Sequence, residues 1–131
     1  MPGSERRAGS REIAVVASRA AADKQAVDVA ILDVSGLIVV TDHFVICSGG
    51  SDRQVKTIVE GIEEAVRELG ERPVRREGES DAGWILLDYV DVVVHVFAQE
   101  EREYYDLERL WRDAPRVSWD EQEQAAAGSL D

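Results

Sequence analysis

Apolar residues recur along the chain in blocks, and their spacing changes from that of a helix to that of a strand. Residues 52–69 give the clearest helical pattern, because one face of this segment is almost entirely apolar. The residues of that face are Val55, Ile58, Val59, Ile62, Ala65, Val66 and Leu69. Ser51 and Gln54 predict a capping box at the start of this helix, and Gly70 predicts its end.

The region before this helix combines an Ala-rich helical pattern with shorter apolar runs. Residues 10–24 predict a helix with Ser10 as its N-cap, and small residues dominate its packing face. Residues 27–34 predict a mostly buried strand. One or two further strands are expected in the runs "LIVV", residues 37–40, and "HFVICS", residues 43–48.

The second half of the chain predicts more strands and then helix. Residues 72–79 suit an edge strand, since they carry Pro73 and several charges. Residues 84–98 predict a β-hairpin that turns at Val90 and Asp91, and residues 99–114 predict one helix or two short ones. This order indicates a single-domain α/β sandwich with a mixed sheet of about five strands and flanking helices.

The two ends of the chain lack a sustained core pattern. Residues 1–9 predict a flexible N-terminal arm, because they contain charge but no apolar segment typical of a secretory signal. Residues 10–114 predict the folded domain, and residues 115–131 predict a disordered tail.

The predicted hairpin separates its side chains into two different faces. A two-residue turn would pair Trp84 with Phe97 and Asp88 with Val93. One face is then a core face: Ile85, Leu87, Tyr89, Val92, Val94 and Val96. The other face mixes aromatic, aliphatic and polar residues: Trp84, Leu86, Asp88, Val93, His95 and Phe97. An aromatic-centred patch with a few polar groups is typical of the centre of a protein interface.

Asp88, Asp91 and His95 also raise the question of chemistry. A metal site needs three or four converging ligands, and here one acid lies at the turn and no second histidine is near. Cys47 with His95 would form a nucleophile and base, but a lone cysteine within "FVICS" is typically a small buried apolar residue. The simplest interpretation of His95 is a half-buried imidazole bonded to Asp88 or to backbone.

An enzymatic alternative rests on the sequence "SGGS", residues 48–51, which precedes the second helix. A Gly-Ser turn before a helix, with acids on later strands, loosely resembles nucleotidyltransferases, in which such a turn holds phosphate. Asp88 and Asp91 straddle a turn, however, and Asp52 would repel phosphate. A nucleotidyltransferase-like enzyme or nucleotide-binding protein is therefore the alternative hypothesis.

The charge of the chain changes the expected partner. Its 131 residues carry a net charge of −12, which disfavours a grip on nucleic-acid phosphates and favours a basic protein partner. The same acidity would also serve solubility alone. One cysteine permits no internal disulfide, which indicates an intracellular protein, and no apolar run is long enough to span a membrane.

Four segments together resemble the RsfS/Iojap family of ribosomal silencing factors: "VTDHFVICSGGSDRQV", "RREGE", "WILLDYVDVVVHVF" and "EEREYYDLERLW". The resemblance covers residues 11–114 and implies a nucleotidyltransferase-like fold without catalytic residues or cofactors. It also implies a cytoplasmic protein that binds the large ribosomal subunit through ribosomal protein L-fourteen (uL-fourteen), with little nucleic-acid contact. Such binding would block subunit joining and repress translation, and homodimers are expected.

The predicted partner-binding residues combine the mixed hairpin face with acids and a tyrosine nearby: Glu77, Glu79, Trp84, Leu86, Asp88, Asp91, Val93, His95, Phe97 and Tyr104. Val90 departs from the family pattern, which often has Gly in the hairpin turn. Because Val disfavours a positive φ, a turn wider than two residues is the alternative to the two-residue turn.

Overall fold

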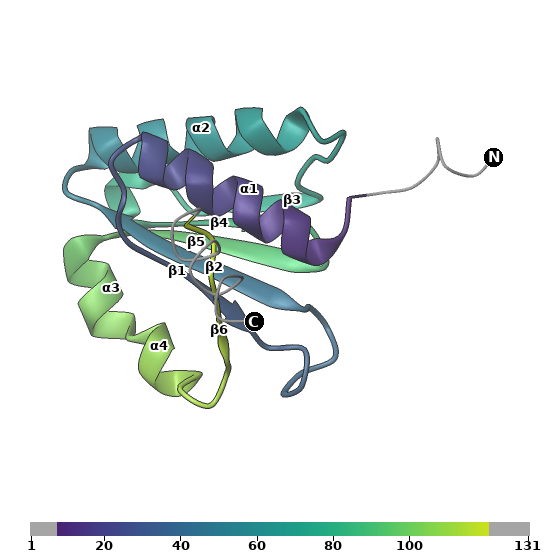
Figure 1. The fold of residues 1–131 in the computed structure, drawn as a ribbon. Coiled ribbons are helices and arrows are strands. Elements are labelled where there is room, and N and C mark those ends of the chain that lie inside the picture. Colours follow the sequence, from purple (N-terminus) through teal and green to yellow (C-terminus); the bar gives the residue numbers. More distant parts are fainter. Residues whose placement is uncertain (1–7, 121–131) are drawn as a thin grey trace.

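A computed structural model describes residues 8–120, which form one sheet with helices on both of its faces (Figure 1). The helices are α1 (Ser10–Asp23), α2 (Asp52–Arg67), α3 (Gln99–Tyr105) and α4 (Leu107–Leu110), with a 3-10 turn, η2, at Ser80–Ala82. The strands are β1 (Val27–Asp33), β2 (His43–Gly49), β3 (Arg75–Glu77), β4 (Trp84–Asp88), β5 (Val92–Ala98) and β6 (Arg116–Val117). The predicted α/β sandwich is confirmed.

The sheet of the described residues has six strands in the order β3-β4-β5-β2-β1-β6. Strands β2 and β5 are parallel, and the other neighbours are antiparallel, so the sheet is mixed as predicted. Helix α2 lies on the connection that leads from β2 towards the parallel strand β5, as a crossover of parallel strands requires. The prediction of about five strands missed β6, which has only two residues.

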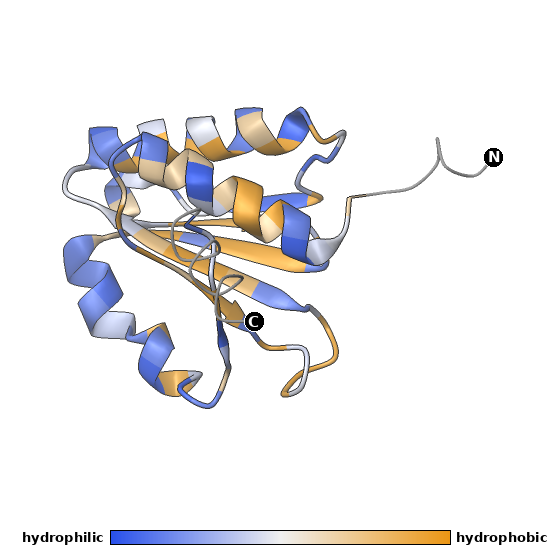
Figure 2. Ribbon diagram, in the orientation of Figure 1, coloured by the Kyte–Doolittle hydropathy of each residue, from blue (hydrophilic) through white to orange (hydrophobic). Residues whose placement is uncertain are grey.

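Helices α1 and α2 cover the first face of the sheet, and the main core lies between them and the strands (Figure 1). The small residues Ala14, Ala17 and Ala21 of α1 are fully buried, so they let this helix approach α2 and the sheet closely. Figure 2 shows the apolar sides of both helices turned towards apolar strands. This arrangement follows from the helical period read in the sequence.

Both ends of α2 are stabilised by local hydrogen bonds. The Ser51 side chain accepts from the backbone N–H of Gln54 at 3.1 Å, as the predicted capping box requires. The Gln54 side chain instead accepts from the N–H of Gly50 at 2.7 Å, one residue earlier than expected. Gly70, at φ +85°, ends the helix in the left-handed conformation that favours glycine.

Two local predictions before α2 are wrong. Ser10 is the first residue of α1, and the N-cap is Gly9, which offers no side-chain acceptor. The run "LIVV", residues 37–40, is a loop whose backbone turns back on Val34 through hydrogen bonds from Leu37 and Ile38. Only Ile38 packs inward, against the smaller core, while Val39 is fully exposed, so an apolar run here marks a surface loop.

The C-terminal boundary predicted at residue 114 is too early. Strand β6 pairs with the edge of β1, and the indole N–H of Trp119 donates to the carbonyl of Val29 at 3.0 Å. Trp119 also packs against the main core, and its carbonyl accepts from Arg19 of α1 at 3.0 Å. These few residues give no periodic signal, so sequence alone left them in the tail. The rest of the predicted tail, and most of the predicted arm, lie outside the described residues.

Candidate protein-binding surface

The second face of the sheet, opposite α1 and α2, carries the mixed residues of the hairpin. The pairing of β4 with β5 places Trp84 opposite Phe97, Leu86 opposite His95 and Asp88 opposite Val93. This confirms the predicted register and the separation of the two faces. The first-face residues of the hairpin, from Ile85 to Val96, are almost completely buried.

Helices α3 and α4 cover one part of the second face, as Figure 1 shows below the sheet. A smaller core forms beneath them from Leu32, Val34, Phe44, Ile46, Phe97 and Ala114. Phe97 is fully buried and His95 is 6% exposed, so these two predicted partner-binding residues cannot be surface contacts. The sequence could not show this, because the cover comes from a segment that is distant along the chain.

The aromatic rings of this face form one connected cluster. The ring centroid of Trp84 lies 4.8 Å from that of Phe97 and 4.5 Å from that of Tyr105. His95 lies between Trp84 and Phe44, with its centroid 5.1 Å from Phe44 in an edge-on geometry. Such ring pairs stabilise a fixed arrangement beyond the area they bury. The contacts with Phe97, Tyr105 and His95 therefore hold the Trp84 ring in a fixed position.

A hydrogen bond between Trp84 and His95 fixes the imidazole. The indole Nε1–H donates to Nδ1 of His95 at 3.2 Å, so the proton of the neutral ring lies on Nε2. Burial lowers the pKa of His95 to about 4, and the ring is therefore neutral at physiological pH. The expectation that His95 bonds to Asp88 or to backbone is wrong, because its hydrogen-bond partner is the indole of Trp84.

The two acids of the hairpin serve different structural roles. Asp88 accepts the backbone N–H of Val90 at 2.8 Å and pairs with Arg75 at 3.4 Å. Asp91 is exposed at the turn, and its backbone carbonyl accepts from the N–H groups of Asp42 and His43. Asp88 thus supports the turn and an edge-strand arginine. Within residues 8–120, no three His, Cys, Asp or Glu side chains are grouped so that they could hold a metal ion.

The turn has the two residues, Val90 and Asp91, on which the predicted register rests. The N–H of Tyr89 donates to the carbonyl of Val92 at 2.8 Å, and Val90 adopts φ +73°. The alternative of a wider turn is therefore wrong. The bond from Val90 to Asp88, and the two bonds that the Asp91 carbonyl accepts, hold the backbone in a conformation that valine alone disfavours.

The uncovered part of the second face contains a hollow of about 300 Å³ next to Trp84. Its lining residues are Glu77, Gly78, Ala82, Trp84, Leu86 and Tyr105. Trp84 and Leu86, as well as Val93 further along the face, are half-buried, while Glu77 is exposed on the edge strand β3. Three of the predicted residues therefore meet here: Glu77, Trp84 and Leu86.

Tyr105 is a residue of this hollow that the sequence analysis missed. The tyrosine predicted instead was Tyr104. Its side chain is 82% exposed and touches Tyr105 edge-on, outside the hollow. Choosing between neighbouring tyrosines requires the direction of α3 relative to the sheet, which the sequence does not give. Glu79 is exposed beside η2 and does not line the hollow.

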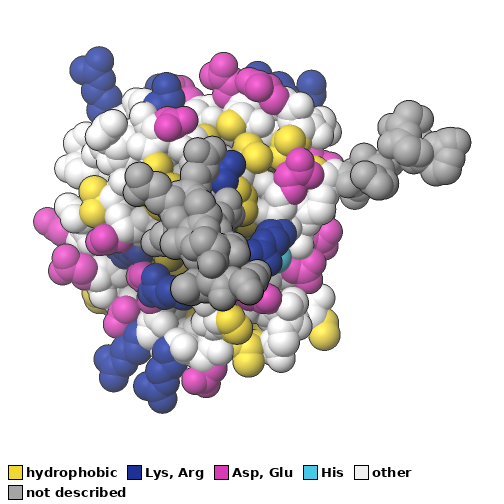
Figure 3. All heavy atoms as spheres, in the orientation of Figure 1, with side chains coloured by type: hydrophobic (Ala, Val, Ile, Leu, Met, Phe, Trp, Pro, Cys, Tyr) yellow, Lys and Arg dark blue, Asp and Glu magenta, His cyan; other side chains and the backbone are white. Residues whose placement is uncertain are grey.

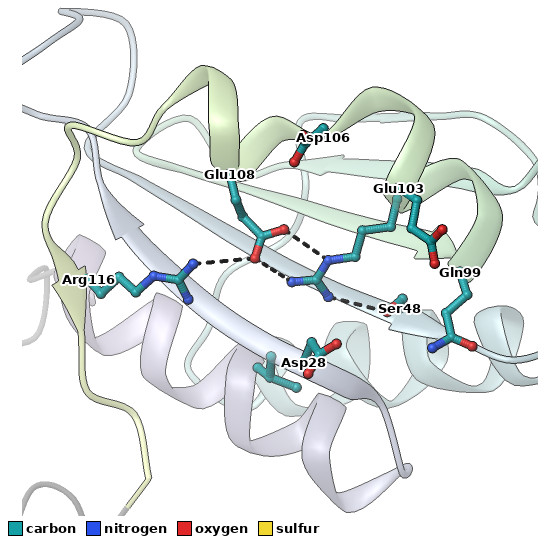
Figure 4. A pocket seen from close by; sticks show the side chains of 9 residues that line it. Asp28, Ser48, Gln99, Glu103, Asp106, Glu108 and Arg116 are labelled. Atoms are coloured by element: carbon teal, nitrogen blue, oxygen red, sulfur yellow. Dashed lines mark hydrogen bonds and ion pairs between the residues drawn. The ribbon is translucent and has the colours of Figure 1, made fainter.

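A buried arginine holds the cover in place. Arg102 of α3 is 8% exposed and binds Glu108 through two nitrogens, at 3.1 and 2.8 Å. It also donates to Ser48 of β2 and to the carbonyl of Val27, at 3.2 and 3.1 Å. Figure 4 marks the bonds that reach Glu108 and Ser48. The Arg102 guanidinium, through its hydrogen bonds, lowers the pKa of the Glu108 carboxyl below its ordinary value. This cluster ties α3 and α4 to the central strands.

Two groups of the "SGGS" turn are engaged in the cap of α2. The N–H of Gly50 donates to the Gln54 side chain, and the Ser51 hydroxyl oxygen accepts the N–H of Gln54. Cys47 is buried, and burial raises the pKa of its thiol to about 12, so it is no nucleophile at neutral pH. The geometry therefore gives no support to the enzymatic alternative.

The side of the molecule seen in Figure 3 shows acidic and basic side chains interspersed, without one continuous basic stripe. A nucleic-acid-binding face would require clustered Lys and Arg. None of the helices described is long and apolar enough to cross a lipid bilayer.

Taken together, these features define a small α/β sandwich domain that presents a rigid, partly uncovered aromatic surface. A family model described as "Ribosomal silencing factor during starvation" matches residues 7–130. The chain belongs to this RsfS/Iojap family of ribosomal silencing factors.

Known proteins and a solved structure are similar to this protein over most of its length. The ribosomal silencing factor RsfS of Bacillus subtilis is 44% identical over 110 residues, which are 84% of this chain and 93% of that protein. The chloroplastic protein Iojap of Zea mays is 32% identical over 107 residues, 79% of this chain but 45% of that protein. A crystal structure of a Chromobacterium violaceum protein has a TM-score of 0.76 at 36% identity, covering 79% of this chain and 87% of that one.

Proposed function

We propose that this protein binds the large ribosomal subunit through ribosomal protein L-fourteen (uL-fourteen), using the uncovered part of the second face. The bound protein would block joining of the small subunit by its bulk and so repress translation. Membership of a family of ribosomal silencing factors supports the ribosomal target. The identity of the ribosomal protein comes from the family resemblance.

The observation that carries the proposal is the state of Trp84. Its ring is anchored on Phe97 and Tyr105 and its N–H is bonded to His95, yet it remains half-exposed beside Leu86. A large aromatic side chain held rigid at a surface loses little conformational freedom on binding, and such residues dominate interface energetics. The net charge of −12 favours a basic partner over exposed phosphates.

The proposed action is binding without catalysis. The second face offers an aromatic cluster and Asp88, whose carboxylate is engaged in structural bonds, and the buried His95 is surrounded by rings. The protein would act in the cytoplasm with little direct nucleic-acid contact. Homodimer formation stays a prediction, which sedimentation equilibrium of the purified protein measures.

Co-sedimentation with separated ribosomal subunits tests the proposal. We expect the protein to pellet with the large subunit and not with the small one. When the subunits are mixed afterwards, the loss of whole ribosomes should be proportional to the fraction of large subunits that are occupied. Inhibition of subunit joining by far less than one copy of the protein per large subunit would require a catalytic action and would contradict the steric mechanism.

A further inference from the structure

The hollow beside Trp84 combines an apolar floor with an acidic rim. Leu86 and the rings of Trp84 and Tyr105 form its apolar surfaces, and Glu77 stands at its edge. Its volume of about 300 Å³ lies at the lower limit for small-molecule pockets. The hollow therefore suits a single side chain of a partner better than a larger free ligand.

The two rings suit a cation with an aliphatic stem. Trp84 and Tyr105 lie 4.5 Å apart between centroids, tilted by 48°, so their faces do not stack flat on one another. Aromatic faces attract ammonium and guanidinium groups, and indole does so most strongly. Leu86 adds apolar surface on which the methylene groups of a Lys or Arg can lie.

One carboxylate, that of Glu77, supplies negative charge to the hollow. Glu77 already binds one guanidinium, because Nε of Arg75 lies 2.8 Å from its Oε2. That pair is exposed on both sides, so the carboxylate remains open to a second donor. Glu101 of α3 reaches over the neighbouring Gly83, where a Cβ would lie 2.5 Å from its Oε1, but neither residue lines the hollow.

We propose that this hollow receives one basic side chain, an arginine or a lysine, from the protein that binds the second face. The identity of that protein rests on the proposed function, whereas the chemistry of the hollow rests on its own residues. A purely apolar side chain would desolvate the Glu77 carboxylate without pairing it, and a phosphate would be repelled. A cation pairs with this acid and with the rings together.

A short peptide tests the chemistry without a ribosome. The probe is acetyl-Gly-Arg-Gly-amide, and its match is the same peptide with citrulline, which keeps the shape and removes the charge. Proton–nitrogen correlation spectra of the full chain should show the indole signal of Trp84 shifting with the arginine peptide, with at least about tenfold weaker response to citrulline. The indole of Trp119, bonded to Val29 of β1 towards the other edge of the sheet, is an internal control that should not move.

Variants that remove one negative charge test whether the arginine peptide binds at the hollow. Glu77→Gln should lower the affinity for the arginine peptide by about threefold to tenfold. Glu60→Gln makes the same change on an exposed position of α2, on the other side of the sheet, and should leave it unchanged. Equal responses to the two peptides, or equal effects of the two variants, would overturn the proposal.

Binding of the same variants to purified large ribosomal subunits distinguishes a failure of this proposal from a failure of the proposed function. With purified large subunits, Glu77→Gln should weaken binding about tenfold and Glu77→Arg by more, while Glu60→Gln should not. Wild-type protein that binds large subunits while both Glu77 variants bind equally well would exclude the hollow from the contact. Wild-type protein that fails to bind large subunits would contradict the proposed function, and the peptide spectra would still decide the chemistry of the hollow.

Discussion

Along β4 and β5, successive side chains point to opposite faces of one sheet, and the two faces differ in their cover. The first face is aliphatic, apart from Tyr89, and lies completely beneath α1 and α2. The second face is aromatic and lies only partly beneath α3 and α4, so that Trp84 and Leu86 remain half-exposed. Aliphatic residues pack densely in a closed core, whereas rigid rings at an opening suit recognition. The same hairpin thus supports the fold with one side and a binding surface with the other.

The largest expected effect is the loss of stability in Leu87→Ala, which is compared with the same change at the adjacent Leu86. Leu87 is fully buried on the first face, and Leu86 is half-buried on the second. Leu87→Ala should lower the free energy of unfolding by about 2–5 kcal/mol, because it leaves a cavity. Leu86→Ala should cost about 1 kcal/mol or less and weaken large-subunit binding instead. Urea unfolding and co-sedimentation measure both quantities, and similar stability losses for the two variants would break the distinction between the faces.

The next effect concerns Trp84. Trp84→Ala should weaken large-subunit binding by about 30-fold or more, which corresponds to about 2 kcal/mol. The ring also packs on Phe97 and Tyr105, so this variant should lose some stability as well. Trp84→Phe keeps an aromatic ring and removes the bond to His95, and it should bind better than Trp84→Ala. A folded Trp84→Ala protein with undiminished binding would remove this residue from the interface.

The covered part of the second face should respond to acid. Burial lowers the pKa of His95 to about 4 in the folded protein, against about 6.5 when unfolded, so the unfolded state binds more protons between these values. Stability is therefore full above pH 6.5 and falls as the pH decreases, by about 2 kcal/mol from pH 7 to pH 5. Unfolding curves of His95→Gln over this range should be flatter than those of the wild-type protein. Identical slopes would show that His95 does not titrate in this way.

The smallest expected effect is that of salt on the binding rate. Raising the ionic strength from about 0.05 to 0.5 M should slow association with the large subunit several-fold, because exposed charges are then screened beyond a few ångströms. Stopped-flow measurements of the rate should show a shallower dependence for Glu77→Gln than for Leu86→Ala. A rate independent of salt would indicate a purely apolar contact.

The sequence predicted those features that depend on regular alternation. The buried face of α2 follows directly from the spacing of apolar residues, and the hairpin register follows from alternation once a two-residue turn is assumed; the structure confirms both. The conformation of Val90 could not be predicted, because backbone bonds from Asp42 and His43 to Asp91 help to hold the turn. Tertiary contacts overrode the local preference.

The candidate surface was predictable only in part. Trp84, Leu86 and Glu77 followed from the alternation of β4 and the position of β3 at the edge of the sheet. The burial of His95 and Phe97 depends on α3 and α4, which Arg102 fixes through bonds to residues 54 and 75 positions away. No local pattern identifies such an arginine, so the limit of the open surface required the structure.

Site-specific crosslinking tests the central claim most directly. A photoreactive phenylalanine analogue at Leu86 lies on the open part of the second face, and the same analogue at Lys56 lies on the exposed side of α2. In the complex with large ribosomal subunits, position 86 should crosslink to ribosomal protein L-fourteen (uL-fourteen), and position 56 should give no such product. A crosslink to that protein from position 56 alone, or to a different ribosomal protein from position 86, would contradict the account.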